Sequence, residues 1–558
     1  MKNRNIIKAL LFLPLLMLLV FTGCKDEESL GNADRLFRPM INQSTISMTW
    51  IKIAWDKYSG TKYYDLEISK DSFKTVLQSN HTDSTQFTFR NLDFDTKYQI
   101  RIRAIGDQTI STGDTISSRY YNTELSTIDY PTLLTVPTSS DVIDNSIKVS
   151  WALSNLVYSR IDVMLNKDSV YKSVPLTAAD NAAGVKIISG LQPKTSYIVK
   201  IFAEDGYKGK KTFKTTASQV FQGDVVDLRN YTDEQSKSLL TQLYVDSLGG
   251  AHPNGFNLVL SGGTTYSIPT LILPVPMNIV TGLSFRGKAL MAVNGSIAVK
   301  GGITVDSIKF DKVFFTEGNA SGKLKTDANF GATYVINMNQ SGGNINKLIF
   351  ENCDVKYKRG AIRMQTTANV SKLSINNCVF DSIADYGIVN NGNDASYIGD
   401  ISVTNSTFAH CYKLFTCGKK LGINSLNISN ITTCYTPYIS GASIYYLFDY
   451  ATNTVPGGIT VKNSVFGTGS NTTSGGSTAV NGIRTATGAI TSFTNCYKTS
   501  DLTWAVSTVD GVTPVAPIND LIDLKKTSAE TFANPTLSNF KVTNNATLFN
   551  KIGDPRWW

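Results

Sequence analysis

The sequence has few of the residues on which disulfide scaffolds and acid–base active sites depend. It contains three His, and only His410 falls where a motif recurs along the chain. Its seven Cys show no CxxC spacing, and none lies between Cys24 and Cys353. This usage excludes a disulfide scaffold. The later Cys are predicted to act as small buried apolar residues.

Concentrated charge and long apolar runs are also missing. The net charge of +9 is spread over the whole chain, so it does not indicate a nucleic-acid partner. It permits an acidic partner such as a uronate-containing polysaccharide. After residue 21 no apolar run reaches the roughly 20 residues that span a bilayer. The remainder is therefore expected to fold as several soluble domains of ~100–200 residues each.

The N-terminus is organised as an export signal. Lys2, Arg4 and Lys8 precede an apolar stretch over residues 9–21, which is too short for a membrane span. The stretch ends in the tetrapeptide Phe21-Thr22-Gly23-Cys24. This tetrapeptide resembles the lipobox of bacterial lipoproteins. The resemblance implies cleavage after residue 23, lipidation of Cys24 and a membrane anchor.

The residues after Cys24 indicate where the anchor would hold the protein. Lys25 is followed by the acidic run Asp26-Glu27-Glu28. This arrangement resembles the surface-export signal of Bacteroidetes lipoproteins, which implies the outer face of the outer membrane. The alternative is a polar linker, over residues 24–34, that happens to be acidic.

Residues 35–220 contain two copies of one β-type pattern, in which a strand ending in Trp precedes a Leu-x3-Thr-x-Tyr motif. The copies are Ile51–Trp55 with Leu92, Thr96, Tyr98 and Ala104, and Ile147–Trp151 with Leu191, Thr195, Tyr197 and Ala203. The pattern resembles fibronectin type III domains, whose Trp is core and whose Tyr hydroxyl bonds to nearby backbone. Two such sandwiches are expected, at residues 35–127 and 128–220, serving as a spacer. A ligand-binding loop around Tyr58, Tyr63 and Tyr64 is the alternative.

The composition of residues 221–558 shifts toward Gly, Asn, Ser and Thr, and one short unit recurs every 25 to 33 residues. Its pattern is φ-x-φ-x-Asn-[Cys/Ser], where φ is apolar. Copies end at Asn352, Asn377, Asn405, Asn430, Asn463 and Asn495, and a degraded copy covers residues 308–312. About 22–30 residues suit one coil of a parallel β-helix at ~3.3 Å per strand residue.

Each part of the unit has an expected structural role. Asn suits a tight left-handed turn and can bond to the Asn of the next coil. The Cys or Ser that follows is expected to point inward, where only a small side chain fits. Residues 232–248 have helical spacing after a Thr. They predict a helix that caps the open end of the solenoid.

The repeated unit resembles right-handed parallel β-helix proteins of the pectate-lyase-like superfamily. The combination with fibronectin-like domains, and the ending Gly553-Asp554-Pro555-Arg556-Trp557, is similar to Bacteroidetes surface lipoproteins without an assigned activity. The resemblance implies an all-β chain with two fibronectin type III-like sandwiches followed by a right-handed parallel β-helix. It also implies association with polysaccharide uptake. Trp557 and Trp558 are expected to pack on the last coil.

The superfamily places its substrate groove on the strand that begins about ten residues after each Asn. With alternate residues outward, the predicted outward row is Arg363, Val389, Thr416, Asp449 and Arg484. A basic cluster and several aromatic and amide side chains accompany this row. The candidate glycan-binding residues are Lys356, Lys358, Arg359, Arg363, Gln365, Asn391, Tyr386, Tyr412, Asp449 and Arg484.

The row supports binding better than catalysis. It contains one carboxylate, whereas a hydrolase needs a close pair and a calcium-dependent lyase needs several. Further acids occur in the flanking turns, at Asp354, Asp381 and Asp385. Arg binds carboxylates through its planar fork, and Tyr rings can stack on sugars. His410 is expected to be partly buried, with a site role as the lesser reading.

Three functions remain open. The first is a non-catalytic surface lipoprotein that captures polysaccharide for an outer-membrane transporter, with no nucleic-acid partner, no metal and no cofactor. The second is a polysaccharide lyase or glycoside hydrolase acting on an acidic glycan, with Ca2+ involved only if it is a lyase. The third is an adhesin or structural surface protein.

The lipid anchor gives the first testable prediction. Replacing Cys24 by Ser should abolish incorporation of radiolabelled fatty acid and move the protein from the membrane fraction to the soluble fraction. Equal labelling of the variant and the natural chain would show that Cys24 is not the acceptor.

Overall fold

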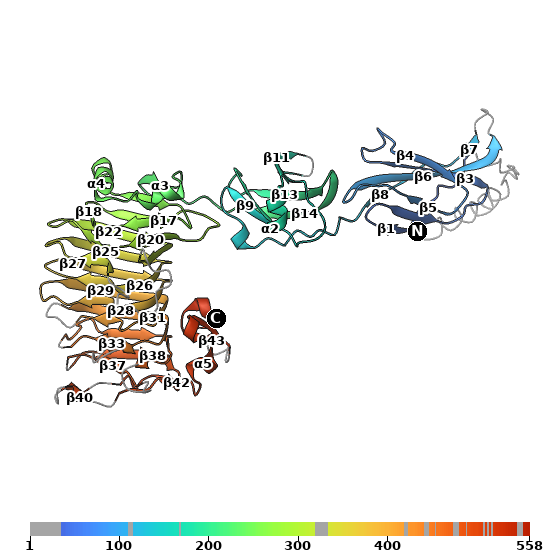
Figure 1. Cartoon of the computed structure of the whole chain (residues 1–558). Coiled ribbons are helices and arrows are strands. Elements are labelled where there is room, and N and C mark those ends of the chain that lie inside the picture. Colours follow the sequence, from blue (N-terminus) through green and yellow to red (C-terminus); the bar gives the residue numbers. More distant parts are fainter. Residues whose placement is uncertain are drawn as a thin grey trace, which may run out of the picture. The chain divides into compact units, whose positions relative to one another are not determined.

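The computed structural model describes residues 35–109, 115–166, 169–317, 333–417, 422–439, 446–451, 453–471, 479–486, 488–505, 508–509, 513–514, 517–543 and 551–558. Across these residues the protein is all-β, with two antiparallel sandwiches followed by a parallel β-helix (Figure 1). One compact unit holds most of both sandwiches, and a second holds the β-helix. The predicted lipidation at Cys24 and the linker lie outside the described residues. Within the described residues, no helix is both long enough and apolar enough for a membrane span.

The first sandwich has the predicted Trp and Tyr in its core. One sheet contains β1 (Ile41–Ile46), β2 (Ile51–Trp55) and β5 (Gln86–Phe89), and the other contains β4 (Gln78–Thr82), β3 (Thr61–Ser69), β6 (Lys97–Thr109), β7 (Thr115–Ser117) and β8 (Tyr121–Ser126). Trp55 and Tyr98 are buried, and the Tyr98 hydroxyl accepts a hydrogen bond from the Asp93 backbone N–H at 2.8 Å. This is the expected tyrosine corner.

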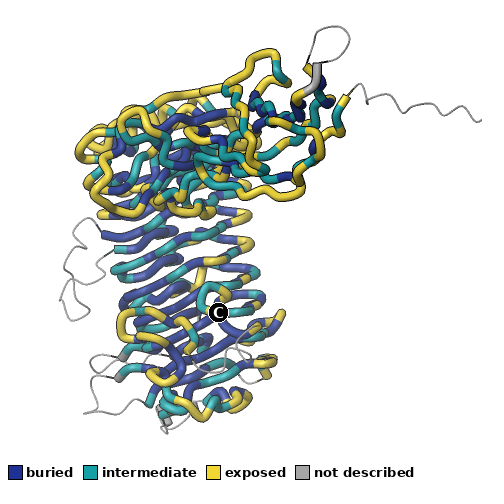
Figure 2. Tube along the Cα trace, turned by 90° about the vertical axis from the view of Figure 1, so that its right-hand side faces the viewer, coloured by how far each residue is buried: buried dark blue, intermediate teal, exposed yellow. Residues whose placement is uncertain are grey.

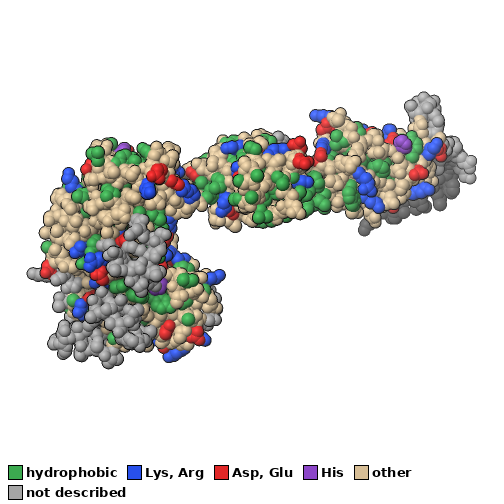
Figure 3. All heavy atoms as spheres, viewed as in Figure 1, with side chains coloured by type: hydrophobic (Ala, Val, Ile, Leu, Met, Phe, Trp, Pro, Cys, Tyr) green, Lys and Arg blue, Asp and Glu red, His purple; other side chains and the backbone are tan. Residues whose placement is uncertain are grey.

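The second sandwich repeats the arrangement with fewer strands. Its larger sheet has the order β11 (Val170–Pro175), β10 (Arg160–Met164), β13 (Ser196–Ala203) and β14 (Gly206–Lys214), and its smaller sheet pairs β12 (Val185–Ser189) with β9 (Ser146–Ser150). Trp151 and Tyr197 are buried as predicted. Tyr64 of the first sandwich is also buried against Trp55, so it is not a loop residue. Lys and Arg are interspersed with Asp and Glu on the visible face of the sandwiches (Figure 3).

The β-helix has three faces of parallel, in-register strands. Face A stacks β16 (Phe256–Leu260), β19 (Met277–Thr281), β22 (Thr304–Asp311), β25 (Asn344–Glu351), β27 (Asn369–Asn376), β29 (Tyr397–Ala409), β31 (Ile423–Cys434), β34 (Ile459–Lys462) and β38 (Thr491–Thr494). The apolar residues of the repeated unit align there, and buried segments run through every coil (Figure 2). The predicted repeat is therefore confirmed as the coil of the solenoid.

Faces B and C complete each coil. Face B stacks β17 (Thr265–Ile268), β20 (Ala289–Val293), β23 (Val313–Thr316), the starts of β26 (Asp354–Met364) and β28 (Val379–Asn391), the ends of β29 and β31, β35 (Val465–Phe466), β39 (Tyr497–Lys498) and β42 (Ile522–Asp523). Face C stacks β18 (Leu271–Leu273), β21 (Ile297–Val299), β24 (Tyr334–Met338), the ends of β26 and β28, β30 (Phe415–Thr416), β33 (Tyr446–Asp449) and β37 (Asn481–Arg484). Face C is the predicted groove face.

The Asn turns lie between faces A and B and are left-handed, as predicted. The six Asn have φ between 49° and 56°, a region that Asn tolerates better than most residues. The Asn377 amide donates to the Asn352 side-chain oxygen at 2.6 Å, and the Asn495 amide donates to Asn463 at 2.8 Å. The ladder is interrupted elsewhere: Asn405 donates to Asn376, and Asn430 donates to the Lys551 carbonyl.

The small residues after the Asn point into the core. Cys353, Cys378, Ser406, Ser464 and Cys496 are all fully buried, and the Cys are free thiols. The Cys378 backbone N–H donates to the Ser406 hydroxyl at 3.0 Å, so the inward residue of one coil satisfies the backbone of its neighbour. Burial raises the pKa of Cys496 to about 11. These thiols are therefore structural.

The N-terminal end of the β-helix is capped by two helices where the sequence predicted one. Thr232 caps α3 (Asp233–Lys237), and Thr241 caps a second helix, α4 (Gln242–Ala251). Thr241 begins the second helix because its hydroxyl accepts a hydrogen bond from the Tyr244 backbone N–H. The Gln242 amide accepts from the Ile272 N–H at 2.7 Å and donates to the Ile272 carbonyl at 2.9 Å. It thereby replaces a neighbouring strand at the exposed edge.

The chain returns along face B after the last coil. This C-terminal strap, residues 527–543 and 551–558, contains α5 (Ser528–Thr531), β43 (Phe532–Asn534), β44 (Asn539–Val542) and the turn Pro555–Trp557. Phe532 and Phe540 pack on outward residues of face B. The strap lies beside the middle coils (Figure 1). The prediction that Trp557 packs on the last coil is therefore wrong.

The GDPRW ending provides the anchors of the strap. The Asp554 carboxylate, 1% exposed, accepts from the Thr407 hydroxyl at 2.7 Å, and the Trp557 indole donates to that hydroxyl at 2.7 Å. Gly553 has a φ of 77° and donates its N–H to the Asn463 carbonyl at 2.7 Å. The Asp554 N–H donates to the Thr432 hydroxyl at 3.0 Å. Arg556 donates to the Asn377 side chain at 2.6 Å. Four coils are thus joined by five consecutive residues.

Removing the central anchor should loosen the strap. Asp554→Ala deletes the acceptor of the Thr407 hydroxyl, and a hydrogen bond to a charged group contributes about 1.5–3 kcal/mol. Hydrogen exchange of residues 527–558 should accelerate in this variant and remain unchanged in Asp520→Ala, which removes an exposed carboxylate. Unchanged exchange in the Asp554 variant would mean that the apolar contacts alone hold the strap.

Candidate functional site

Backbone pairing aligns one row of outward residues on face C. The row runs Asn337, Arg363, Asn390, Thr416, Asp449 and Arg484. The predicted alignment of Arg363, Thr416, Asp449 and Arg484 is confirmed. The predicted member Val389 is wrong by one residue, because it pairs with Ile362 and is fully buried.

A local irregularity explains the error. The pairing of β26 with β28 shifts between Lys358 and Gly360, because β28 has two more residues than β26 over this stretch. The extra length carries Asp385 and Tyr386 to the surface of the groove. It also places Asn390, rather than Val389, in the outward row.

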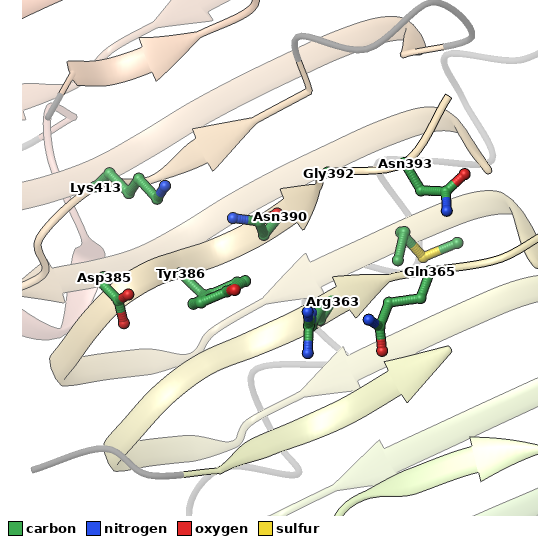
Figure 4. Close-up of a pocket in the computed structure, with 9 residues that line it drawn as sticks. Arg363, Gln365, Asp385, Tyr386, Asn390, Gly392, Asn393 and Lys413 are labelled. Atoms are coloured by element: carbon green, nitrogen blue, oxygen red, sulfur yellow. The ribbon is translucent and has the colours of Figure 1, made fainter. Parts of the chain in front are cut away.

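A cavity of about 450 Å³ lies where this bulge meets the row. It is lined by Arg363, Met364, Gln365, Asp385, Tyr386, Asn390, Gly392, Asn393 and Lys413. Three successive coils contribute side chains, with Asp385 and Tyr386 at one end and Gln365 and Asn393 at the other (Figure 4). The lining therefore combines cations, one carboxylate, one aromatic ring and three amides.

Arg363 lies between two aromatic rings. Its guanidinium carbon is 5.0 Å from the Tyr334 ring centroid and 4.9 Å from that of Tyr386. The two rings meet edge to face at 5.2 Å. Cation–π attraction holds the guanidinium in place, and burial raises the pKa of Tyr334. The two rings hold the Arg363 guanidinium at the cavity. Its described hydrogen bond goes to the Tyr334 hydroxyl and not to a carboxylate.

Arg359 forms a bidentate ion pair with Asp385 beside this cluster. Its guanidinium donates to both Asp385 oxygens at 2.9 and 3.0 Å and lies 4.4 Å from the Tyr386 centroid. The hydrogen bond with Asp385 raises the pKa of Arg359. This bidentate contact occupies the carboxylate that lines the cavity. Asp385 is therefore better placed to hold Tyr386 and Arg359 than to act as an acid or base.

A second arginine pair lies farther along the row. Arg484 donates to both Asp449 oxygens at 2.8 Å, and its guanidinium carbon lies 4.7 Å from the Tyr446 centroid. The two carboxylates of the groove, Asp385 and Asp449, are thus each engaged by an arginine. Among the described residues, no group of three or more His, Cys, Asp or Glu could hold a metal ion.

Lys413 is a lining residue that the sequence reasoning missed. Burial lowers its pKa, and the charges of Asp449 and Asp385 partly oppose that effect. It belongs to the coil after Tyr386 and lies two residues before strand β30. Arg359, Tyr386 and Lys413 each lie just before a segment of face C, in three successive coils. This repeated placement would have identified Lys413 from the sequence. Tyr334, Asn390 and Asn393 were also missed.

Two predicted glycan-binding residues are buried. Lys358 is 0% exposed, donates to the Val293 carbonyl at 2.8 Å and to the Thr333 hydroxyl, and lies 3.9 Å from Glu317. Asn391 is also 0% exposed, and its amide donates to the Ser396 carbonyl at 3.0 Å. Neither can contact a glycan, so both predictions are wrong. The bulge in β28 and the change of face along β26 turned these side chains inward.

Lys356 and Tyr412 are partly exposed but lie outside the cavity. Lys356 belongs to face B, 3.2 Å from Asp381, and Tyr412 stacks on Tyr438 with a centroid separation of 5.4 Å. Six of the ten candidates therefore remain on the groove face. They are Arg359, Arg363, Gln365, Tyr386, Asp449 and Arg484.

His410 belongs to a buried polar cluster away from the groove. Its Nδ1 lies 3.0 Å from an Asp381 oxygen, and the Ser538 hydroxyl of the strap donates to the other Asp381 oxygen at 2.9 Å. Burial by itself would raise the pKa of Asp381, but the His410 hydrogen bond and the Lys356 charge outweigh it and lower the pKa. Ser538 and Asp381 approach the same ring nitrogen, so His410 cannot relay a proton between them.

The fold and the site define an all-β protein whose fibronectin-type sandwiches precede a parallel β-helix with a basic, aromatic cavity. A family model for the fibronectin type III domain matches residues 37–117. A model described as a domain of unknown function (DUF5123) matches residues 401–557. The latter range includes Lys413, Asp449, Arg484 and most of the strap, but begins after Arg363 and Tyr386.

Solved structures similar to this chain include segments of two chicken proteins. The two-domain fibronectin type III segment of chicken tenascin is 19% identical and has a TM-score of 0.16, covering 32% of this chain and 99% of that chain. The FN1–FN3 domains of chicken CNTN1 are 18% identical and have a TM-score of 0.14, covering 32% and 66%. None of the curated proteins matches.

The burial of Lys358 gives a prediction that separates structure from binding. Lys358→Met leaves Glu317 buried beside a neutral side chain, and breaking a buried charge pair in this way costs about 3–5 kcal/mol. Chemical denaturation should show a loss of this order for Lys358→Met and a loss below about 1 kcal/mol for Arg363→Ala, which is partly exposed. Equal stability of the two variants would contradict the assignment of Lys358 to the core.

Proposed function

We propose that this protein captures acidic polysaccharide in the groove of face C without cleaving it. The observation that carries the proposal is the cavity in which Arg363, fixed between Tyr334 and Tyr386, faces the amides of Gln365, Asn390 and Asn393. A guanidinium binds a uronate carboxylate through two parallel hydrogen bonds. Amides bind sugar hydroxyls, and the Tyr386 ring offers an apolar surface to a sugar face.

The charge balance of the groove favours an anionic ligand. Arg359, Arg363, Lys413 and Arg484 supply four cations, against the two carboxylates of Asp385 and Asp449. Both carboxylates are held in bidentate arginine contacts. They shape the groove, while the remaining positive charge attracts the ligand. A groove with this net positive charge attracts an acidic ligand more strongly than a neutral one.

The proposed cellular setting rests on the sequence. The lipobox-like residues ending at Cys24 support a lipid anchor, and the acidic run after it supports exposure on the outer membrane. Sandwich domains between an anchor and a binding domain suit a spacer. Capture at the surface would then deliver polysaccharide to an outer-membrane transporter.

A polysaccharide lyase is the second candidate, and Lys413 is the observation that favours it. Its lowered pKa increases the fraction of neutral amine, which is the form that removes a proton. Arg363 in the same cavity would neutralise the uronate carboxylate. The engagement of Asp385 and Asp449 by arginines speaks against the glycoside hydrolase alternative, which needs two available carboxyl groups.

Replacing Arg363 tests capture directly. Arg363→Ala removes a charge-assisted contact of about 1.5–3 kcal/mol, so affinity for polygalacturonate or alginate should fall roughly 10- to 100-fold. Affinity electrophoresis of the full chain measures the change. Arg286→Ala removes an arginine that is paired with Asp233 at the N-terminal cap, and should leave retention unaltered.

The outcomes distinguish the candidates. Retention of acidic glycan without unsaturated product supports capture. Unsaturated product that disappears in Lys413→Met would establish a lyase instead. Absence of both retention and product across the acidic glycans would overturn the proposal, and retention equal in Arg363→Ala and the natural chain would move the site elsewhere.

A further inference from the structure

The cavity on face C contains a buried amide, that of Asn390. This residue is 8% exposed and lines the cavity. None of the hydrogen bonds among the residues that the structure describes involves its side chain. A primary amide has two N–H donors and one carbonyl acceptor, and a buried polar group is ordinarily hydrogen-bonded. The Asn390 amide therefore marks a place for a ligand group that can both donate and accept.

Asn390 lies between two cations that come from the coils on either side. Backbone pairing places it beside Arg363 of β26 and Thr416 of β30, and Lys413 precedes Thr416 by three residues. The Asn390 side chain lies between those of Arg363 and Lys413 (Figure 4). Adjacent strands are about 4.8 Å apart, so the two cations come from coils roughly 10 Å apart. The cavity thus offers two positions for carboxylates, with an amide between them.

The coil that carries Asn390 adds no positive charge of its own. Among the described lining residues, its charged member is Asp385, whose two oxygens accept from Arg359 at 2.9 and 3.0 Å. A ligand carboxylate at the level of this coil would face Asp385 and a neutral amide at a largely desolvated position. Burying a charge that gains no ion pair is costly, and the Asp385 charge would add repulsion. The middle position therefore favours an uncharged sugar.

The flanking positions of the outward row are neutral or balanced as well. On one side, β24 contributes Asn337 next to Arg363. On the other side, Asp449 and Arg484 occupy successive coils and are joined by two hydrogen bonds of 2.8 Å. A polymer with a carboxylate on every sugar would place most of its charges beside such positions. The row therefore matches a ligand whose charges are spaced.

We propose that the groove selects an acidic polysaccharide in which charged and uncharged sugars alternate. This inference rests on the capture function proposed above and adds the charge pattern of the ligand. The carboxylates of a first and a third sugar lie at Arg363 and Lys413, and hydroxyl or acetamido groups of the second sugar bond to Asn390. A sugar in an extended glycan is about as long as the spacing between adjacent strands, so three consecutive sugars match three consecutive coils.

The test compares two kinds of acidic chain, because a chain of uronates alone can also turn alternate carboxylates away from the groove. Affinity electrophoresis of the full chain is run with hyaluronan, in which uronate and N-acetylhexosamine alternate. It is repeated with polygalacturonate and polymannuronate, in which every sugar is a uronate. At equal carboxylate concentration and ionic strength, hyaluronan should bind about 10-fold more tightly, since a mismatch at one buried polar group has an effect of that order.

Two substitutions of Asn390 connect the preference to the middle coil. Asn390→Lys places a cation there and should reverse the preference toward the uronate homopolymers. Asn390→Ala removes the amide with a smaller side chain and should abolish most of the preference, so it carries the test if circular dichroism shows that the lysine variant does not fold. The matched control is Ser402→Lys, which adds the same charge to an exposed position of face A and should leave the preference unchanged.

The possible results separate this inference from the capture function. A preference for hyaluronan that is lost in Asn390→Ala supports the inference. Equal or tighter binding of a uronate homopolymer by the natural chain overturns it and leaves the capture function standing. A preference that persists in Asn390→Ala also overturns it, because the uncharged sugar would then lie elsewhere. Absence of retention by all three glycans overturns the capture function and this inference with it.

Discussion

Register between coils is the constraint on which the rest of this structure depends. Each coil of the β-helix pairs with the next through parallel backbone hydrogen bonds, and the left-handed Asn turns fix where one face ends and the next begins. A Cys or Ser after the Asn fits the narrow interior and binds the backbone of its neighbour. Because register is fixed, outward side chains from successive coils align in rows, and the proposed groove on face C is built on such a row.

The groove on face C arises where this regularity is broken. Two extra residues in β28 push Asp385 and Tyr386 outward, and the cavity forms between this bulge and the following coils. The ion pairs of Arg359 with Asp385 and of Arg484 with Asp449 lie along the groove. Arg363 and Lys413 supply its remaining charge. The C-terminal strap and the N-terminal helices stabilise other parts of the solenoid. Residues 553–557 of the strap bond to four coils, and Gln242 closes an open strand edge.

The sequence predicted the features that repeat and failed at those that do not. The alternating strands, the Asn turns and the inward Cys or Ser recur in successive coils, so a single chain was enough to find them and to align Arg363 with Arg484. The position of Val389 was wrong because a bulge is a local insertion without a periodic signal. Lys358 was assigned to the surface because a charged residue is rarely buried. In the structure its buried ammonium group lies beside the Val293 carbonyl, the Thr333 hydroxyl and Glu317. The strap joins residues about 150 positions apart, a distance over which local patterns carry no information.

The most direct test of the account is chemical labelling of Arg363. Phenylglyoxal modification of the full chain, read by mass spectrometry with and without polygalacturonate, reports which guanidinium groups a bound carboxylate covers. The account predicts that Arg363 is labelled in the free protein and protected by the glycan, while Arg286 at the cap is labelled equally in both states. Protection of arginines in the sandwiches with none at Arg363 would contradict the assignment of the groove as the binding site.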